Sequence, residues 1–297
     1  MLHIIGMGDN VVDINVTLGQ RFPGGNSVNV AIFSQYLGYR SSFMGVVGND
    51  EEGDLVRAAL NDKNVDTRYI QTKEGETGKC RIELNNGDRT ITDINDLGVV
   101  RTDPLILDEE ILDYIRTADL VHTACYGCMI PELHKINAIQ IPILYDYSDK
   151  WTEEKLVEVA EFSTYILFSG RERPLEELEA YVRRLVGTGR CEMVICTMGK
   201  RGAMIYDGRE LYLTKAFGQD VRIVDSTAAG DAFITGFITT YLLGKKHFNL
   251  LQRNPDKQIE WTLPDEDESD YHRSLVRYAI NKGNMQALYT CMHEGSF

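Results

Sequence analysis

The sequence has no apolar run close to the roughly 20 residues that a membrane-spanning helix needs, and its first residues lack the charged-then-apolar pattern of a secretion signal. Positive charge is also in short supply. With 31 Lys and Arg against 45 Asp and Glu, the formal net charge is -14, so the phosphate backbone of a nucleic acid would on average be repelled. These absences argue against membrane and nucleic-acid partners and favour a cytoplasmic location.

The sequence also lacks the repeated cysteine motifs of a metal-binding protein. Six cysteines are scattered over the chain, and without a secretion signal reduced thiols are the expected state. Cys125 and Cys128 form a CxxC, but no second CxxC and no histidine pair at zinc-finger spacing accompanies it. Packing at a strand end is therefore favoured over a metal or redox role for these two thiols.

No internal repeat and no low-complexity linker divides the 297 residues, so we expect a single domain. Short β-rich apolar runs alternate with longer helical patterns. This alternation predicts an α/β fold in which helices cover a mostly parallel sheet. The predicted strand and helix pairs are 42–47 with 54–63, 120–123 with 130–137, 141–145 with 153–160, and 165–168 with 175–185.

Two stretches, residues 11–20 and about 72–96, interrupt this alternation and predict a small β-sheet attached to the α/β body. Apolar and polar side chains alternate between residues 78 and 94, and Asn86-Gly87 is a strong hairpin signal because both residues tolerate positive φ. Such a sheet would serve either as a lid over a cleft or as a homodimer contact. A third stretch, residues 245–272, is polar and is expected to be a solvated insertion between two helices.

Residues 224–233 read VDSTAAGDAF and join an apolar run at 221–224, expected to be a strand, to a helix that starts near Gly230. The unpaired N–H groups and the positive dipole end of such a helix stabilise an anion, and small residues let a phosphate approach the backbone. Asp231 would then be placed to accept a proton from an attacking hydroxyl. An aspartate that only favours the helix dipole is the alternative interpretation.

A second turn of small residues contains Gly24 and Gly25. Asn26 or Ser27 can cap the helix that follows, and Asn29 on its first turn is expected to point back toward the glycine pair. Glycine amides and a carboxamide can together hold a polyhydroxylated ligand, although a plain capped helix explains the same spacing.

A third turn, at residues 194–205, is expected to be a strand, a glycine turn and a second strand. Its hydroxyl, glycines and basic groups suit the phosphate tail of a nucleotide, and an ordinary hairpin is the alternative. Gly6 and Gly8 follow the first apolar run, but a dinucleotide-binding GxGxxG would need glycine where Val11 stands. A Rossmann dehydrogenase is therefore rejected.

These motifs, in this order and over nearly the whole chain, resemble those of the PfkB/ribokinase family of carbohydrate kinases. The motifs are Gly8-Asp9-Asn10 with Asp13, Gly24-Gly25-x-x-Asn29-x-Ala31, Gly45-x-x-Gly48-Asn49-Asp50-x-x-Gly53, Thr197-Met198-Gly199-x-x-Gly202 and Asp225-Ser226-Thr227-Ala228-Ala229-Gly230-Asp231. The resemblance implies a ribokinase-like three-layer α/β sandwich with a small β lid, and ATP-dependent phosphorylation of a hydroxyl group.

The resemblance also implies roles for the residues of the VDSTAAGDAF stretch. Asp231 matches the family's catalytic base, and the amides of Ala228, Ala229 and Gly230 match its anion hole. The commonest family motif has glycine where Ala228 stands. An alanine still supplies the backbone amide, so the anion hole is expected to be intact.

For the nucleotide, the resemblance implies contacts from Thr197, Gly199 and Gly202, and from Gly283 and Asn284 near the C-terminus. The metal is expected to be Mg²⁺, and the resemblance leaves open a monovalent cation such as K⁺.

The family's Asn-x-x-Glu motif, which is linked to Mg²⁺, falls at residues 169–172, where Ser169 replaces the asparagine. Only Glu172 carries over from this motif, and it would act largely through water because Mg²⁺ keeps part of its hydration shell.

For the substrate, Asp13 matches the carboxylate that binds sugar hydroxyls, with Gly24, Gly25 and Asn29 on the same side. The stretches Gly8-Asp9-Asn10, Gly24-Gly25-Asn26-x-x-Asn29-Val30-Ala31 and, after Asp146, Ser148-Asp149-Lys150-Trp151 are most similar within the family to those of bacterial fructoselysine 6-kinases. This resemblance implies a fructosamine phosphorylated at O6. Acidic groups at Asp9, Asp93 or Asp96 and a base at Arg81 would suit such a substrate. The alternatives are a kinase for a simple ketohexose, ribose or a nucleoside, and a catalytically inactive sugar-binding protein.

Overall fold

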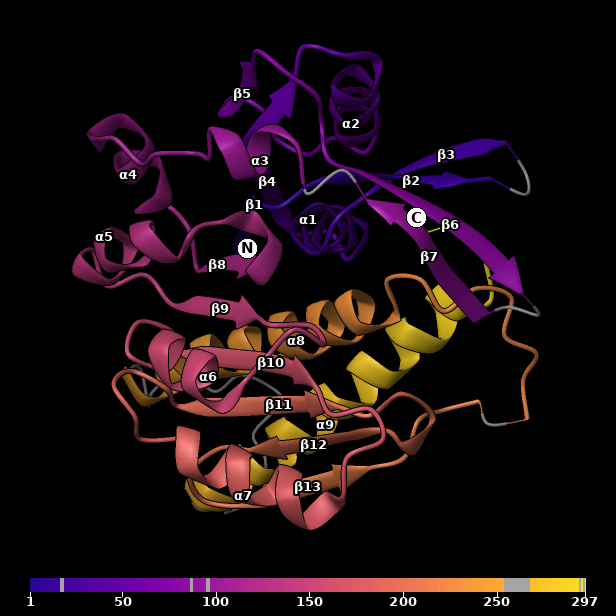
Figure 1. The fold of residues 1–297 in the computed structure, drawn as a ribbon. Helices are drawn as coiled ribbons and strands as arrows, with labels where there is room; N and C mark the ends of the chain where they lie inside the picture. Colours follow the sequence, from indigo (N-terminus) through magenta and orange to yellow (C-terminus); the bar gives the residue numbers. More distant parts are fainter. Residues whose placement is uncertain are drawn as a thin grey trace.

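A computed structural model of the chain describes residues 1–16, 19–85, 88–94, 97–218, 220–253, 268–293, 295 and 297. The central layer of the described fold is a nine-stranded sheet with the order β13-β12-β11-β10-β9-β8-β1-β4-β5 (Figure 1). All neighbouring strands pair in parallel except β11 with β12 and β12 with β13. The strands are β1 His3–Gly8, β4 Arg40–Gly48, β5 Ile70–Lys73, β8 Leu120–Ala124, β9 Ile143–Asp146, β10 Tyr165–Ser169, β11 Met193–Thr197, β12 Ala203–Tyr206 and β13 Leu211–Thr214.

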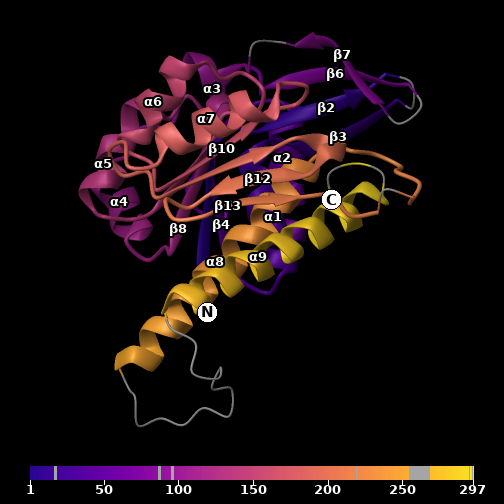
Figure 2. The same cartoon turned by 90° about the horizontal axis from the view of Figure 1, so that it is seen from below.

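Helices cover both faces of this sheet and complete the predicted three-layer α/β sandwich. The first group comprises α3 Val99–Thr102, α4 Glu109–Ile115, α5 Leu133–Ala138, α6 Glu153–Ala160 and α7 Leu175–Leu185. The second group comprises α1 Asn26–Tyr36, α2 Glu51–Asp62, α8 Ala229–Arg253 and α9 Glu268–Cys291. Helices α8 and α9 lie side by side (Figure 2).

Alternating side chains of the strands supply the two main cores. On β1, Ile5 and Met7 are fully buried against the α4–α7 side, whereas Ile4, like Leu2 just before the strand, is buried against α8 and α9. This alternation follows from the two-residue repeat of a strand, and a strand covered on both faces reads as a continuous apolar run. The predicted strand and helix pairs are confirmed in this arrangement.

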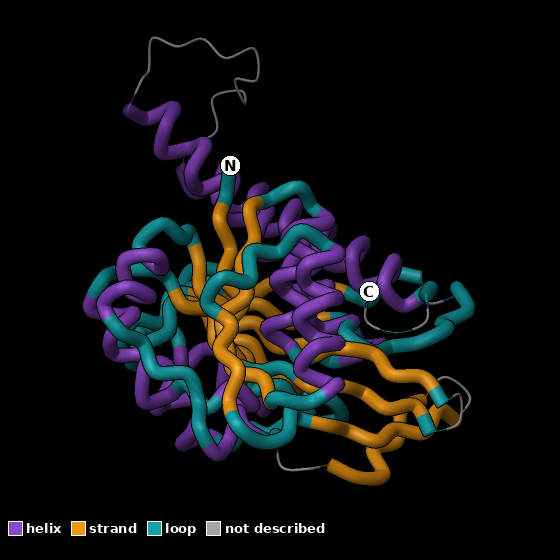
Figure 3. Tube along the Cα trace, turned by 90° about the horizontal axis from the view of Figure 1, so that it is seen from above, coloured by secondary structure: helices purple, strands orange, loops and turns teal. Residues whose placement is uncertain are grey.

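A second sheet of four strands, which we call the lid sheet, has the order β3-β2-β6-β7. Figure 3 shows its strands extending beyond the helical layers. Its strands are β2 Val11–Asn15, β3 Gln20–Gly24, β6 Lys79–Asn85 and β7 Asp88–Ile94. The predicted hairpin turn at Asn86-Gly87 lies outside the described residues.

One prediction about the final third of the chain is wrong, and the bounds of another are too wide. Residues 221–224 form a loop rather than a strand, and the backbone amide of Val224 donates to the carbonyl of Cys291 at the end of α9 (2.9 Å) instead of to a neighbouring strand. Both ends of the insertion predicted at 245–272 are helical instead, because α8 continues to Arg253 and α9 begins at Glu268. Residues 254–267 lie outside the described residues.

Candidate active site

The candidate site lies where the first turns of α1 and α8 meet. The two helices pack against each other. Strands β1, β8 and β9 are parallel, so their carboxyl ends lie at the same edge of the sheet, beside α1. In α/β folds, ligands bind at the carboxyl ends of parallel strands. We call residues 24–29 the α1 turn and residues 225–231 the α8 turn.

The backbone of the α8 turn has an unusual conformation at Ala228, the first of its two alanines. Ala228 has φ 59°, in the left-handed region that L-residues adopt at a cost of roughly 1 kcal/mol or more. Ala232 donates its amide to the carbonyl of Ala228, so helical hydrogen bonding begins directly after this residue (2.9 Å). A Cβ at Gly230 would meet no atom within 4 Å, so the first helical turn is open on the side of Gly230. Such a turn can receive an anion.

Asp225 fixes the other end of the α8 turn. Its buried carboxylate accepts hydrogen bonds from the amide of Thr227 (2.8 Å) and from the amide of Gly295 (3.1 Å). The carbonyl of Cys291 accepts from the amides of Val224 and Asp225. The end of α9 and the residues after it therefore brace this loop from the far end of the sequence.

The α1 turn engages three buried carboxylates from three different parts of the chain. Asn26 donates its side-chain amide to Asp146 (2.8 Å), and the Ser27 hydroxyl donates to Asp9 (2.5 Å). The N-cap of α1 is Gly25, which has φ 110° and makes no side-chain cap. The prediction that Asn26 or Ser27 caps the helix is wrong, because both residues are helical and their side chains bind these carboxylates instead.

Asn29 makes the third contact and joins the two turns. Its side-chain Nδ2 donates to Oδ2 of Asp231 at 2.7 Å, and both residues are buried. Asn29 thus contacts the aspartate rather than pointing back toward Gly24 and Gly25. A hydrogen bond between residues 202 positions apart ties the small-residue turn of α1 to the start of α8.

Burial raises the pKa of two of these carboxyl groups. At Asp9 it outweighs the hydrogen bonds from Ser27. Burial, together with the nearby charges of Asp9 and Asp149, raises the pKa of Asp146 to about 6. Hydrogen bonds from Ser148 and Asn26 act in the opposite direction. An ion pair with Arg171 at 2.9 Å partly compensates the negative charge of Asp149. The site therefore gathers carboxyl groups where burial disfavours their ionised form.

The lid sheet carries Asp13 on β2, the strand whose Val11 pairs with Gly24 of the α1 turn. Asp13 is buried on β2, and its register partner Cys80 on β6 is buried as well. Arg81 pairs with Ile14, so it lies on the opposite face of the sheet, where it is exposed and 3.7 Å from Asp93. The structure thus does not bring Arg81 together with Asp13. Asp96 lies outside the described residues.

The residues predicted to bind a nucleotide lie on and beside the neighbouring strands. Thr197 ends β11, and Gly199 and Gly202 have φ 56° and 95° in the turn that follows. A Cβ at Gly202 would collide with the carbonyl of Thr214, so only glycine fits there. Asn284 is buried on α9 and donates to the hydroxyl of Thr214 (3.1 Å), which makes it a link between α9 and β13.

Glu172, the predicted metal ligand, is exposed on the turn after β10. Over the part of the chain that the structure describes, no group of three or more His, Cys, Asp or Glu could hold a metal ion by itself. In the same part of the chain, no helix combines the length and apolar character needed to cross a membrane.

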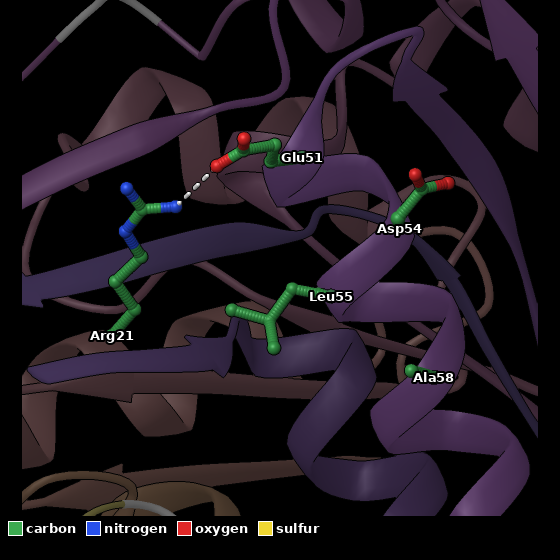
Figure 4. A pocket seen from close by; sticks show the side chains of 5 residues that line it. All are labelled: Arg21, Glu51, Asp54, Leu55 and Ala58. Carbon is green, nitrogen blue, oxygen red and sulfur yellow. Dashed lines mark hydrogen bonds and ion pairs between the residues drawn. The ribbon is translucent and has the colours of Figure 1, made fainter.

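A shallow pocket of about 490 Å³ lies apart from the two turns, between β3 and α2 (Figure 4). Its lining residues are Arg21, Glu51, Asp54, Leu55 and Ala58. Arg21 forms an ion pair with Glu51 at 3.1 Å, which anchors the lid sheet to α2.

The comparison with known proteins identifies the family. The model of the pfkB family carbohydrate kinases matches residues 3–253. The chain belongs to the pfkB family of carbohydrate kinases. This kinase is 32% identical over 241 residues to fructosamine kinase FrlD of Bacillus subtilis (strain 168), which covers 81% of this chain and 84% of the relative. It is 31% identical over 250 residues to fructoselysine 6-kinase of Escherichia coli (strain K12), which covers 82% and 91%.

Solved structures support the fold of this kinase independently. Ribokinase from Giardia lamblia superposes with a TM-score of 0.76 at 16% identity, covering 100% of this chain and 95% of that one. Arabidopsis thaliana ribokinase complexed with ribose and ATP gives 0.73 at 18% identity, covering 99% and 93%. The predicted ribokinase-like sandwich is confirmed, and the pfkB kinase is a phosphotransferase that acts on a sugar.

The motifs left several residues of the pfkB kinase site unassigned. Asn26, Ser27 and Asp146 received no role in the site, although Asp146 directly follows the apolar run of β9, a position typical of ligand-binding residues in α/β folds. Asp225 was noted only as part of a motif. Its contact with Gly295 joins residues 70 positions apart, which no local pattern could indicate.

Proposed function

We propose that this sugar kinase transfers the γ-phosphoryl group of ATP to the 6-hydroxyl of a fructosamine such as fructoselysine. The observation that carries the proposal is the hydrogen bond between Asn29 and Asp231. It joins the α1 turn, assigned to the sugar, to the α8 turn, assigned to the transferring phosphoryl group. An acceptor hydroxyl and an anion can meet only where two such elements are in contact.

In this proposal Asp231 accepts the proton of the attacking hydroxyl. The amides of Ala228, Ala229 and Gly230 stabilise the charge on the transferring phosphoryl group, supported by the positive end of the α8 dipole. Asp13, Gly24, Gly25 and Asn29 hold the sugar, and Thr197, Gly199 and Gly202 hold the phosphate tail of ATP. Closure of the lid sheet would exclude water from the reaction.

The residues present fit a magnesium ion that is bound mainly by the nucleotide. Mg²⁺ usually keeps several waters and takes one or two carboxylates besides substrate phosphates, so the exposed Glu172 suffices as a protein ligand. When bound, Mg²⁺ neutralises part of the phosphate charge. For a monovalent cation, Thr227 offers a hydroxyl oxygen that is buried beside Asp225 and has no partner among the described residues.

Two observations support a fructosamine over a neutral sugar. The relatives at 31–32% identity are named fructosamine kinase and fructoselysine 6-kinase. Asp9, Asp146 and the half-buried Asp149 place carboxyl groups beside the α1 turn, and the ammonium group of a fructosamine would stabilise their ionised form. Arg81, on the outer face of the lid sheet, is a weaker candidate for the substrate carboxylate.

A substrate panel tests the proposal. ADP formation is measured with fructoselysine, a second fructosamine, fructose, ribose and adenosine, each with Mg-ATP. The proposal expects kcat/KM for a fructosamine to exceed that for fructose by at least about 100-fold, which corresponds to about 2.7 kcal/mol. Preference for fructose, ribose or adenosine would overturn the substrate, and no ADP with any of them would favour an inactive sugar-binding protein.

We also propose that the kinase is cytoplasmic and forms a homodimer through the lid sheet. The outer strands of that sheet are β3 and β7, and outer strands are the places where sheets of two chains can join. Light scattering after size exclusion would give twice the mass of the chain. A fully active monomer at micromolar concentration would contradict the dimer.

A further inference from the structure

Asn29 donates the shortest of the hydrogen bonds that carboxamides of the α1 turn give to carboxylates. Its Nδ2 lies 2.7 Å from Oδ2 of Asp231, and the two residues are 4% and 6% exposed. A hydrogen bond to a carboxylate in a site shielded from water is stronger than a neutral one and less disturbed by competing solvent. The contact therefore fixes the direction of the Asp231 carboxylate.

Both partners of this bond are held by their own helices. The backbone amide of Asn29 donates to the backbone carbonyl of Gly25 (2.8 Å), and the backbone carbonyl of Asp231 accepts from the hydroxyl of Thr235 (2.6 Å). If the bond between the two side chains is lost, each backbone stays in place and cannot bring the side chains together again. A lost bond would remove this restraint on the orientation of the carboxylate.

The same carboxamide has a second atom that needs a partner. Oδ1 of Asn29 is buried and has no hydrogen-bond partner among the described residues. A buried acceptor without a donor costs roughly 1 to 3 kcal/mol, so a ligand that brings a hydroxyl group to it relieves that cost. Asn29 is thus suited to contact both the base and the sugar.

We infer that Asn29 is the positioning residue for Asp231. Its side-chain Nδ2 holds the carboxylate toward the acceptor hydroxyl, and its side-chain Oδ1 accepts a hydrogen bond from the sugar. This inference rests on the proposed role of Asp231 as the base. It differs from a sugar contact alone because it links Asn29 to the rate of the chemical step. Misdirecting a catalytic group by about 1 Å can cost on the order of 10²-fold in rate.

The test is a double-mutant cycle with fructoselysine and Mg-ATP, read as kcat and both KM values. Asn29→Ala is expected to lower kcat about 10- to 100-fold and to leave the KM for ATP unchanged. In an Asp231→Asn background the same change is expected to lower kcat less than about 3-fold, because no base is left to position. The melting temperature of each variant is measured alongside.

Asn26→Ala is the matched control, since it removes the same kind of bond from the same helical turn, but to Asp146. Its effect is expected to be the same in both backgrounds. Equal effects of Asn29→Ala in both backgrounds, or a change in KM for the sugar alone, would overturn the positioning role. Unchanged kcat in Asp231→Asn would instead overturn the proposed base. If Asn29→Ala fails to fold, Asn29→Ser is placed in the same cycle and read by the same criteria.

Discussion

The α1 turn donates hydrogen bonds from its side chains, whereas the α8 turn is held by hydrogen bonds that backbone amides donate. Asn26, Ser27 and Asn29 each donate to a buried carboxylate within one helical turn. The loop before α8 instead depends on Asp225, whose carboxylate accepts two backbone amides, and on the left-handed conformation of Ala228.

This difference follows from what each turn is proposed to bind. A polyhydroxylated, cationic sugar supplies hydrogen-bond donors, so its site can contain carboxylates and an acceptor oxygen that wait for donors. A phosphoryl group supplies only acceptors and negative charge, so its site must present amides and keep carboxylates turned away. Asp231 belongs to the α8 turn and accepts a hydrogen bond from Asn29 of the α1 turn, so both requirements constrain it.

The largest effect is expected from Asp231→Asn, which removes the base while the side chain can still accept the bond from Asn29. General-base catalysis contributes roughly 10² to 10⁴ in rate, so kcat should fall by that factor with little change in either KM. The measurement is steady-state kinetics with the best substrate of the panel. Asp220→Asn, an exposed aspartate in the same loop, should match the wild type. More than about a tenth of wild-type turnover would contradict the base role.

The buried carboxylates should make the α1 turn sensitive to pH. Asp146 has a pKa of about 6 when folded, above the ordinary value of 3.8, so the folded state binds its proton more tightly. Below about pH 4 the carboxyl group is protonated in both states. Between about pH 4 and 6 only the unfolded state loses the proton readily, so the free energy of unfolding should fall by about 3 kcal/mol and stay lower above pH 6.

Urea unfolding of the wild type and of Asp146→Asn at pH 4, 5, 6 and 7 isolates this contribution, because asparagine does not titrate. The difference between the two free energies of unfolding should move in favour of the variant as the pH rises. A difference that is constant from pH 4 to pH 7 would mean that the folded protein does not resist ionisation of Asp146.

The sequence allowed most of the fold to be predicted, because apolar periodicity is local. Residues 165–168 and 175–185 were expected as a strand and a helix and are found as β10 and α7. The largely apolar residues 221–224 were wrongly expected to form a strand. Val221 and Val224 remain 39% and 37% exposed, and the backbone amide of Val224 donates to the carbonyl of Cys291. Strand propensity does not reveal whether a neighbouring strand is available.

The motifs indicated both turns of the site but not the contacts between them. Asn26 and Asp146 are 120 positions apart, and Asn29 and Asp231 are 202 apart. A single sequence contains no information on which polar residue faces which carboxylate. The glycines and Asp231 were predictable because their chemistry requires those residue types, whereas the carboxylate partners of the α1 turn depend on how the chain folds back.

The brace of the α8 turn should contribute less than the pH-dependent term but affect both stability and turnover. Asp225→Ala leaves the amides of Thr227 and Gly295 without their acceptor, which should cost about 1 to 3 kcal/mol of unfolding free energy and lower kcat. Thermal unfolding and kinetics measure the two effects. Asp220→Ala, in the same loop but exposed, should change neither, and an Asp225→Ala variant as stable and active as this control would show that the brace is dispensable.

The smallest effect is expected at Ala228, where the backbone rather than a side chain sets the geometry. With φ at 59°, glycine avoids the steric cost that alanine incurs, roughly 1 to 2 kcal/mol, but it loses more conformational entropy on folding. Ala228→Gly should therefore raise the free energy of unfolding by about 0.5 to 1 kcal/mol. Ala229→Gly is the matched control, since Ala229 is the first residue of α8 and glycine there should destabilise by up to about 1 kcal/mol. Chemical denaturation distinguishes the two, because opposite signs are expected at adjacent alanines. Equal destabilisation at both would mean that residue 228 does not hold the left-handed conformation on which the geometry of the α8 turn depends.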